Sequence, residues 1–186
     1  MTGSILLLVF VTAQRLGELV YARRNTRRLI AQGGVESGAR HYPLIVGLHA
    51  AWLIGLWLLA WDRPMHAGWL AAYLALQGLR VWTLASLGSR WTTRIVTVPG
   101  ETLVRRGPYR FLPHPNYLVV AGEIAVLPLV FGLWGYALAF SILNAAVLWI
   151  RIRAENRALG MDAAGARRTR SGRPNGRNRA PPVRTG

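Results

Sequence analysis

Five long apolar runs constrain what this chain can fold into. They cover Ser4–Val20, Pro43–Trp61, Gly68–Leu87, Tyr117–Phe131 and Tyr136–Ile150. A helix needs about 20 apolar residues to cross a bilayer. The second and third runs approach that length, whereas the last two have about 15 residues each and span only with their flanks or in a thinned bilayer. The sequence therefore predicts an all-α integral membrane helical bundle with about five transmembrane helices.

The arginines predict the orientation of this bundle. The chain has 23 Arg, no Lys and seven acidic residues, for a formal net charge of +16. Twenty of these arginines lie in residues 21–42, in residues 88–116, or from Arg151 onwards. With five spans, the three segments fall on one side of the membrane, and basic residues accumulate on the cytoplasmic side. We therefore predict the N-terminus outside and the C-terminus inside, which accounts for most of the charge without nucleic acid.

The polar segments complete the predicted organisation. We interpret residues 21–42 as a basic interfacial anchor to anionic lipid, followed by a glycine-rich turn. Residues 88–116 form the longest loop. Loops of this length are usually functional or disordered, and the Val, Leu, Trp and Tyr residues throughout this one argue against disorder. We predict one membrane domain over residues 1–159 and a disordered Arg/Gly/Pro-rich tail over residues 160–186. The chain has no Cys, which excludes disulfides and thiolate metal sites, and no metal site is predicted.

Ionisable side chains within the predicted spans are candidate functional groups, because burying them in lipid is costly. At about 1.5 Å of helix per residue, Glu123 and Arg80 lie roughly 9 and 10 Å deep from the predicted cytoplasmic side of the membrane. We therefore expect their side chains to meet. Arg15 and Glu18 are three residues apart in the first run. Two interpretations remain open here, structural ion pairing between helices and a polar pocket that opens to the cytoplasmic half of the bundle.

Two motifs flank the predicted hairpin of the last two spans. The stretch LVRRGPYRFLPHPNY leads into its first helix, and RIRAEN follows its second helix. In the latter, Arg151 and Glu155 share one helical face with Asn144 and Leu148. The combination resembles the isoprenylcysteine carboxyl methyltransferase family, whose hallmark is G-x-Y-x-x-x-R-H-P-x-Y followed, after a helical hairpin, by R-x-x-x-E. The resemblance covers about residues 70–160. The earlier stretch GGVESGARHYPLIVGLHAAW is similar to a bacterial branch that methylates lipid-like polyketides, such as alkylpyrones and alkylresorcinols.

The resemblance implies a cofactor and a set of site residues within residues 90–159. The cofactor is S-adenosylmethionine, and its implied contacts are Thr102, Leu103, Val104, Tyr109, His114, Pro115, Asn116, Tyr117 and Glu155. The resemblance places Arg151 at the acceptor. Arg80, a candidate because it is ionisable within a predicted span, is also predicted to bind the acceptor. Arg151, Glu155 and Glu123 are the candidate catalytic residues. A carboxylate acceptor needs no base, whereas a phenol or enol would benefit from one, for which Glu123 and His114 are candidates.

The sequence departs from the family pattern in three places. Pro113 stands where the family commonly has Arg before the box histidine, and Glu101 stands where it often has His. After Leu159 an Arg/Gly/Pro-rich tail replaces the aromatic-rich segment that usually closes the pocket.

The predicted function is therefore S-adenosylmethionine-dependent O-methylation of a lipophilic acceptor. The acceptor is an isoprenylcysteine-type carboxylate or a lipid polyketide hydroxyl. Under the resemblance we expect an active site at the cytoplasmic face of a bacterial plasma membrane. The expected partners are a lipophilic small molecule and membrane lipids, with no nucleic acid and no obligate protein partner. A phospholipid or amine N-methyltransferase of related architecture stays open as an alternative, as does a non-enzymatic membrane protein whose Arg80 and Glu123 are structural.

Overall fold

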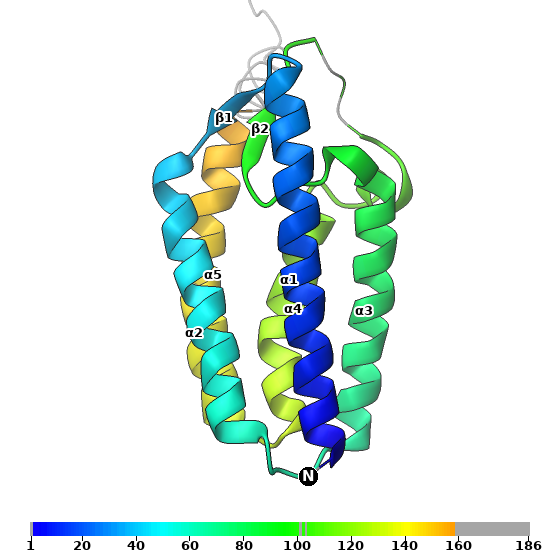
Figure 1. Cartoon of the computed structure of the whole chain (residues 1–186), viewed down its shortest axis with the longest axis vertical. Coiled ribbons are helices and arrows are strands. Elements are labelled where there is room, and N and C mark those ends of the chain that lie inside the picture. The colour runs from blue at the N-terminus through cyan, green and yellow to red at the C-terminus, as the bar shows by residue number, and fades with distance from the viewer. Residues whose placement is uncertain (1, 101, 103, 159–186) are drawn as a thin grey trace, which may run out of the picture.

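Five long helices run side by side along one axis (Figure 1). The computed structural model describes residues 2–100, 102 and 104–158. The helices are α1 (Thr2–Ala31), α2 (Tyr42–Ala60), α3 (Ala67–Leu87), α4 (Pro115–Val130) and α5 (Trp134–Ala158). Each helix contains one of the five predicted apolar runs almost entirely. The predicted tail, residues 160–186, lies outside the described residues.

Four of the helices, α1, α2, α3 and α5, are long and apolar enough to cross a membrane. The fourth helix along the chain, α4, has 16 residues, which corresponds to about 24 Å and falls short of a hydrocarbon core of about 30 Å. It packs against α3 and α5, and half of its residues are buried. The bundle is therefore nearly all helical with four clear candidate spans, and the fifth span stays a prediction.

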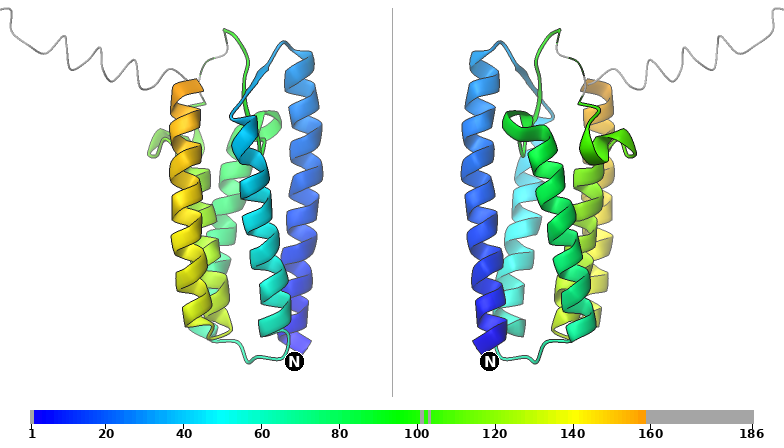
Figure 2. Two further views of the ribbon diagram at one scale, coloured as in Figure 1. Left: turned by 90° about the vertical axis from the view of Figure 1, so that its left-hand side faces the viewer. Right: turned by 90° about the vertical axis from the view of Figure 1, so that its right-hand side faces the viewer.

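The two ends of the bundle differ in what connects the helices (Figures 1 and 2). One end carries the N-terminus and two short connections, residues 61–66 and 131–133. The other end carries the longer connections, residues 32–41 and 88–114, and we call it the sheet end. The described parts of all three basic segments lie at the sheet end, as the sequence predicts. Their side of the membrane stays a prediction.

The sheet end holds the two departures from the predicted fold. Strand β1 (Val35–Ser37) pairs antiparallel with β2 (Ile95–Thr97), so the all-α prediction misses a small sheet. Helix α1 also continues to Ala31, through four arginines that the prediction places in a loop. It continues because Ala22, Asn25 and Leu29 recur at helical spacing and are buried against the rest of the molecule, while the arginines are more exposed.

The apolar core fills the half of the bundle away from the sheet end. It is built from α1–α4 around Leu8, Trp52, Tyr73 and Leu127, all nearly without solvent exposure. Helices α2 and α5 approach closely where Tyr136 Oη donates a 2.8 Å hydrogen bond to the Trp52 carbonyl. A Cβ at Gly55 would collide with the Tyr136 hydroxyl, so this approach needs glycine. The core thus fixes the helices that carry the polar residues of the sheet end.

Candidate active site

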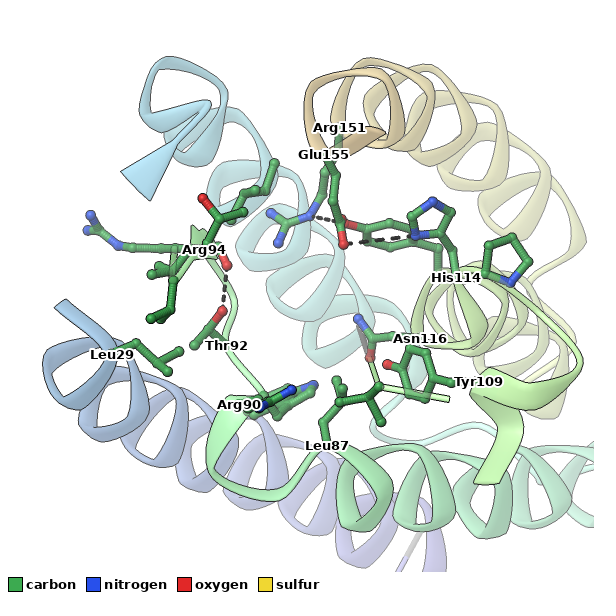
Figure 3. A pocket seen from close by; sticks show the side chains of 18 of the residues that line it. Leu29, Leu87, Arg90, Thr92, Arg94, Tyr109, His114, Asn116, Arg151 and Glu155 are labelled. Carbon is green, nitrogen blue, oxygen red and sulfur yellow. Dashed lines mark hydrogen bonds and ion pairs between the residues drawn. The ribbon is translucent and has the colours of Figure 1, made fainter. Parts of the chain in front are cut away.

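A cavity of about 390 Å³ lies at the sheet end, within the size range of small-molecule sites (Figure 3). Most of residues 90–98, which include strand β2, form one wall. The start of α4 contributes His114, Asn116 and Tyr117, and the last turns of α5 contribute Arg151 and Glu155. The two motifs found in the sequence, which are separated by the α4–α5 hairpin, therefore line one cavity.

Tyr117 links the two motifs directly. Its hydroxyl donates a hydrogen bond to Glu155 Oε2 and accepts one from Arg151 Nε at 2.8 Å. The Arg151 guanidinium carbon also lies 5.6 Å from the centre of the Tyr117 ring, within the range of a cation–π contact. Arg151 Nη2 donates to the Thr93 carbonyl at 2.6 Å. Arg151 is therefore held from both sides, and its Nη1 forms no hydrogen bond within the described part of the chain.

His114 occupies the N-cap position of α4 between two prolines. Pro115 at the first helical position suits a helix start, because it has no N–H that needs a partner. The imidazole Nε2 is 2.9 Å from Asn156 Oδ1, and Nδ1 is 3.9 Å from Glu155 Oε1. His114 thereby connects the start of α4 to the last turn of α5. This contact adds Asn156, which is not among the predicted site residues.

Asn116 carries an unpartnered oxygen in the cavity wall. Its Oδ1 is buried and accepts no hydrogen bond from any described residue. Buried polar atoms in native proteins are nearly always hydrogen-bonded, because losing water without a replacement costs free energy. The oxygen is therefore available to accept a hydrogen bond from a ligand or from water.

Tyr109 lies in a single turn of 3₁₀ helix (Gly107–Arg110) and also lines the cavity. Burial, and then the negative charge of Glu155, raise the pKa of the Tyr109 phenol above its ordinary value. The side chain therefore stays neutral at physiological pH and presents an aromatic ring beside one carboxylate. Gly107 permits this turn, with a φ of 57° and no room for a Cβ beside Ser86.

The remaining predicted contacts are divided between the cavity and other places. Thr102 and Val104 line the cavity, and the Thr102 carbonyl accepts a 2.8 Å hydrogen bond from Arg90 Nη1. Pro115 is buried at the start of α4 and is not among the lining residues. Leu103 and Glu101 lie outside the described residues.

Strand β2 and the stretch before it are part of the site and are absent from the predicted contacts. The run Ile95-Val96-Thr97-Val98 is β-branched throughout, and such a run between turn residues is a strand signal. That signal is present in the sequence. Because turn-forming residues surround the run, the whole segment is predicted to be a loop. The prediction therefore misses both the strand and its place at the cavity.

Arg80 and Glu123 do meet, as predicted, and they form a separate buried cluster. Arg80 Nη1 lies 2.6 Å from Glu123 Oε2, and Arg80 also pairs with Glu18. Arg15 Nη2 lies 2.7 Å from Glu123 Oε2, and Arg15 Nη1 lies 3.3 Å from Glu18 Oε2. Gln77 Nε2 donates to Glu123 Oε1 at 2.7 Å. Neither Arg80 nor Glu123 lines the cavity, so their predicted roles in binding and catalysis remain predictions.

The fold and the cavity together define an integral membrane helical bundle with a cavity at one end, lined in part by polar side chains. The sequence model of the isoprenylcysteine carboxyl methyltransferase (ICMT) family matches residues 69–161, which include α4, α5 and most of the cavity wall. The chain belongs to this family, a family of methyltransferases.

Two curated relatives extend the likeness beyond that region. The Bacillus subtilis protein YpbQ is 40% identical over 159 residues, covering 83% of this chain and 95% of the relative. A Haemophilus influenzae protein is 24% identical over 156 residues, covering 80% of this chain and 90% of the relative. Both are described as uncharacterised. No solved structure matches the chain.

Proposed function

We propose that this protein is an S-adenosylmethionine-dependent O-methyltransferase that acts on a lipophilic acceptor at the cytoplasmic face of the membrane. The observation that carries the proposal is the convergence of His114, Asn116 and Tyr117 with Arg151 and Glu155 on one cavity. The acceptor classes are an isoprenylcysteine-type carboxylate and a lipid polyketide hydroxyl. Family membership supports methyl transfer in general, and the chemistry of the cavity supports the choice of cofactor.

The residues in the cavity fit this cofactor. When bound, S-adenosylmethionine supplies a methyl group carried on a cationic sulfur. Aromatic rings stabilise such cations, and Tyr109 and Tyr117 both line the cavity. Glu155 adds the negative charge, and the unpartnered Asn116 Oδ1 offers an acceptor to an amine or hydroxyl. These four side chains would hold the cofactor.

Arg151 would bind and orient the acceptor. Two of its nitrogens are held by Tyr117 and the Thr93 carbonyl, and Nη1 is left to donate to an acceptor oxygen. Because the guanidinium is buried and fixed, little conformational entropy is lost when the acceptor binds. Methyl transfer is an in-line displacement at carbon, so alignment of the acceptor contributes much of the rate enhancement. A carboxylate acceptor needs no base. For a hydroxyl acceptor, His114 is the candidate base that lines the cavity.

Two measurements test the proposal. Calorimetry on detergent-purified protein is expected to show binding of S-adenosylmethionine and of its demethylated product, S-adenosylhomocysteine, with one site per chain. Absence of binding to both would contradict the proposal. Membranes incubated with methyl-labelled cofactor and candidate lipids are then expected to yield a labelled methyl ester or methyl ether. A labelled methylamine product would instead favour the N-methyltransferase alternative.

A further inference from the structure

One wall of the cavity is held in place by a segment that lies outside the region matched by the family model. The connection between α1 and α2, residues 32–41, contributes strand β1, which pairs with β2 so that Glu36 lies opposite Val96. The family match begins at residue 69. Most of residues 92–98 line the cavity, so the N-terminal part of the chain shapes a site whose motifs all lie in the C-terminal part.

Three contacts fasten this wall segment around Thr93 and Arg94. The Tyr42 hydroxyl, at the start of α2, shares a 3.1 Å hydrogen bond with Thr93 Oγ1. Arg94 Nη1 donates to both carboxylate oxygens of Glu36 at 2.9 Å. The Arg94 guanidinium also stacks on the Tyr42 ring, 4.7 Å from its centre. Two consecutive residues of the wall segment are thus held by α2 and β1.

The same residue, Thr93, holds Arg151. Its carbonyl oxygen accepts the 2.6 Å hydrogen bond from Arg151 Nη2, and Arg151 is only 9% exposed. The direction of a backbone carbonyl depends on how its own residue is held. The Tyr42 hydroxyl holds Thr93 by its side chain, so it acts on Arg151 through one intervening residue.

We propose that Tyr42, with a smaller contribution from Glu36, is a positioning residue that fixes Thr93 and thereby the guanidinium of Arg151 at the cavity wall. The inference rests on the proposed function, in which Arg151 orients the acceptor. Tyr42 contributes more to positioning Thr93 than Glu36 does. Its hydrogen bond is half-buried, whereas the Glu36–Arg94 pair is partly exposed and screened by solvent. Neither residue lines the 390 Å³ cavity.

The test uses Tyr42→Phe, which removes the hydroxyl and keeps the ring on which Arg94 stacks. The full-length protein is labelled with ¹⁵N-arginine in nanodiscs without cofactor, and the Arg151 Nε resonance is assigned by its loss in Arg151→Lys. Tyr42→Phe is expected to shift that resonance and to speed amide exchange over residues 92–97 roughly two- to tenfold, as loss of one hydrogen bond predicts. Glu36→Gln is expected to give the same changes at smaller size.

Val35→Thr is the matched control, because Val35 lies on β1 beside Glu36 and is 58% exposed. It is expected to leave the Arg151 resonance and the exchange rates unchanged. Thr93→Val removes the other partner of the hydrogen bond, so it should reproduce the effect of Tyr42→Phe. The double variant Tyr42→Phe/Thr93→Val should show the same resonance shift and exchange rates as either single variant. An unchanged Arg151 resonance in both single variants, or fully additive effects in the double variant, would overturn the proposal.

Binding of S-adenosylhomocysteine tests the proposed function independently of the positioning role of Tyr42. Calorimetry is expected to show that Tyr42→Phe binds it within about twofold of the wild type, because the variant leaves the proposed cofactor contacts intact. Absence of binding by the wild type would contradict the proposed function, and the resonance and exchange results would still decide the role of Tyr42. A loss of binding confined to Tyr42→Phe and Thr93→Val would show that Tyr42 positions the part of the cavity wall that contacts the cofactor and does not position Arg151. That result would overturn the proposal.

Discussion

Asn116 and Tyr109 show how single side chains define the chemistry of the cavity. Asn116 presents a buried oxygen without a partner among the described residues, and Tyr109 presents a neutral phenol beside Glu155. The first can accept a hydrogen bond from a ligand, and the second, with Glu155, suits a cation. Each property can be removed by one conservative substitution.

Asn116→Ala is expected to weaken S-adenosylhomocysteine binding about tenfold without lowering the melting temperature of the free protein. The loss follows because a hydrogen bond to a buried group disappears, while the free protein makes no described contact with that oxygen. Calorimetry and thermal unfolding measure the two quantities. Leu118→Ala, two residues along α4 and 53% exposed, is the control and should leave affinity unchanged. Unaltered affinity in Asn116→Ala would contradict the assigned contact.

Tyr109 is expected to make stability depend on alkaline pH. Its folded-state pKa is raised above the unfolded value of about 10, so the native state retains a proton that the unfolded state releases. This contribution to the free energy of unfolding is full below about pH 10 and decreases as pH rises towards the folded-state pKa. Chemical unfolding at mildly and strongly alkaline pH should therefore show a smaller decrease in stability for Tyr109→Phe than for the wild type. Equal decreases in the two proteins would rule out this role for Tyr109.

At the scale of the element, the buried ion pairs tie α1, α3 and α4 together. Arg15 and Glu18 come from α1, Arg80 from α3 and Glu123 from α4. The four charges sum to zero, and Glu123 and Arg80 are almost without solvent exposure. Pairing of this kind offsets the cost of placing charge in a low-dielectric interior. The cluster therefore links the three helices through buried charge pairs.

Glu123→Gln is expected to destabilise the bundle by about 3–5 kcal/mol, because it leaves one buried positive charge uncompensated. The double variant Arg80→Met/Glu123→Leu removes one charge of each sign and should recover part of that loss. Unfolding in mixed micelles measures both. A double variant less stable than Glu123→Gln would contradict the charge-balance explanation. A Glu123→Gln protein with intact stability and no methyl transfer would instead favour the catalytic role predicted from the sequence.

At the scale of the whole molecule, the fold brings the basic segments to one end and the cavity to the same end. With five crossings, that end is predicted to face the cytoplasm by the distribution of arginine. Helix α4 is short, and its neighbours α3 and α5 cover much of it. The number of crossings and the side of the cavity are open to direct experiment.

Single cysteines test this topology against a clean background, because the chain contains no Cys. Asp62→Cys and Ala31→Cys place exposed thiols at opposite ends of the bundle. A membrane-impermeant maleimide is expected to label Asp62→Cys in intact cells and Ala31→Cys only after permeabilisation. The reverse pattern would invert the predicted orientation.

A reporter fused at Gly132 is an independent check on the α4–α5 hairpin. We expect it on the same side as the Asp62→Cys thiol, outside the cytosol, if α4 crosses the membrane. A reporter at Gly132 on the side of the Ala31→Cys thiol would show that α4 does not cross.

Much of this protein was determined by the sequence alone. Apolar runs located all five helices, since burial in lipid or core demands continuous hydrophobicity whatever the partners are. Helical spacing placed Arg151 and Glu155 on one face, and depth along the spans predicted that Arg80 and Glu123 would meet. These features depend on local periodicity and length, which a sequence records directly.

The segments that line the cavity, and the contacts that hold the lining residues in position, became apparent only from the tertiary structure. The β1–β2 pairing and the Tyr42–Thr93 hydrogen bond join residues more than 50 positions apart, so the local strand signal at residues 95–98 does not identify its partner. The tertiary structure also separated the Arg80–Glu123 cluster from the cavity, although both lie among the same helices. Side-chain partners across distant segments depend on how helices pack, and the periodicity of any one segment does not specify them.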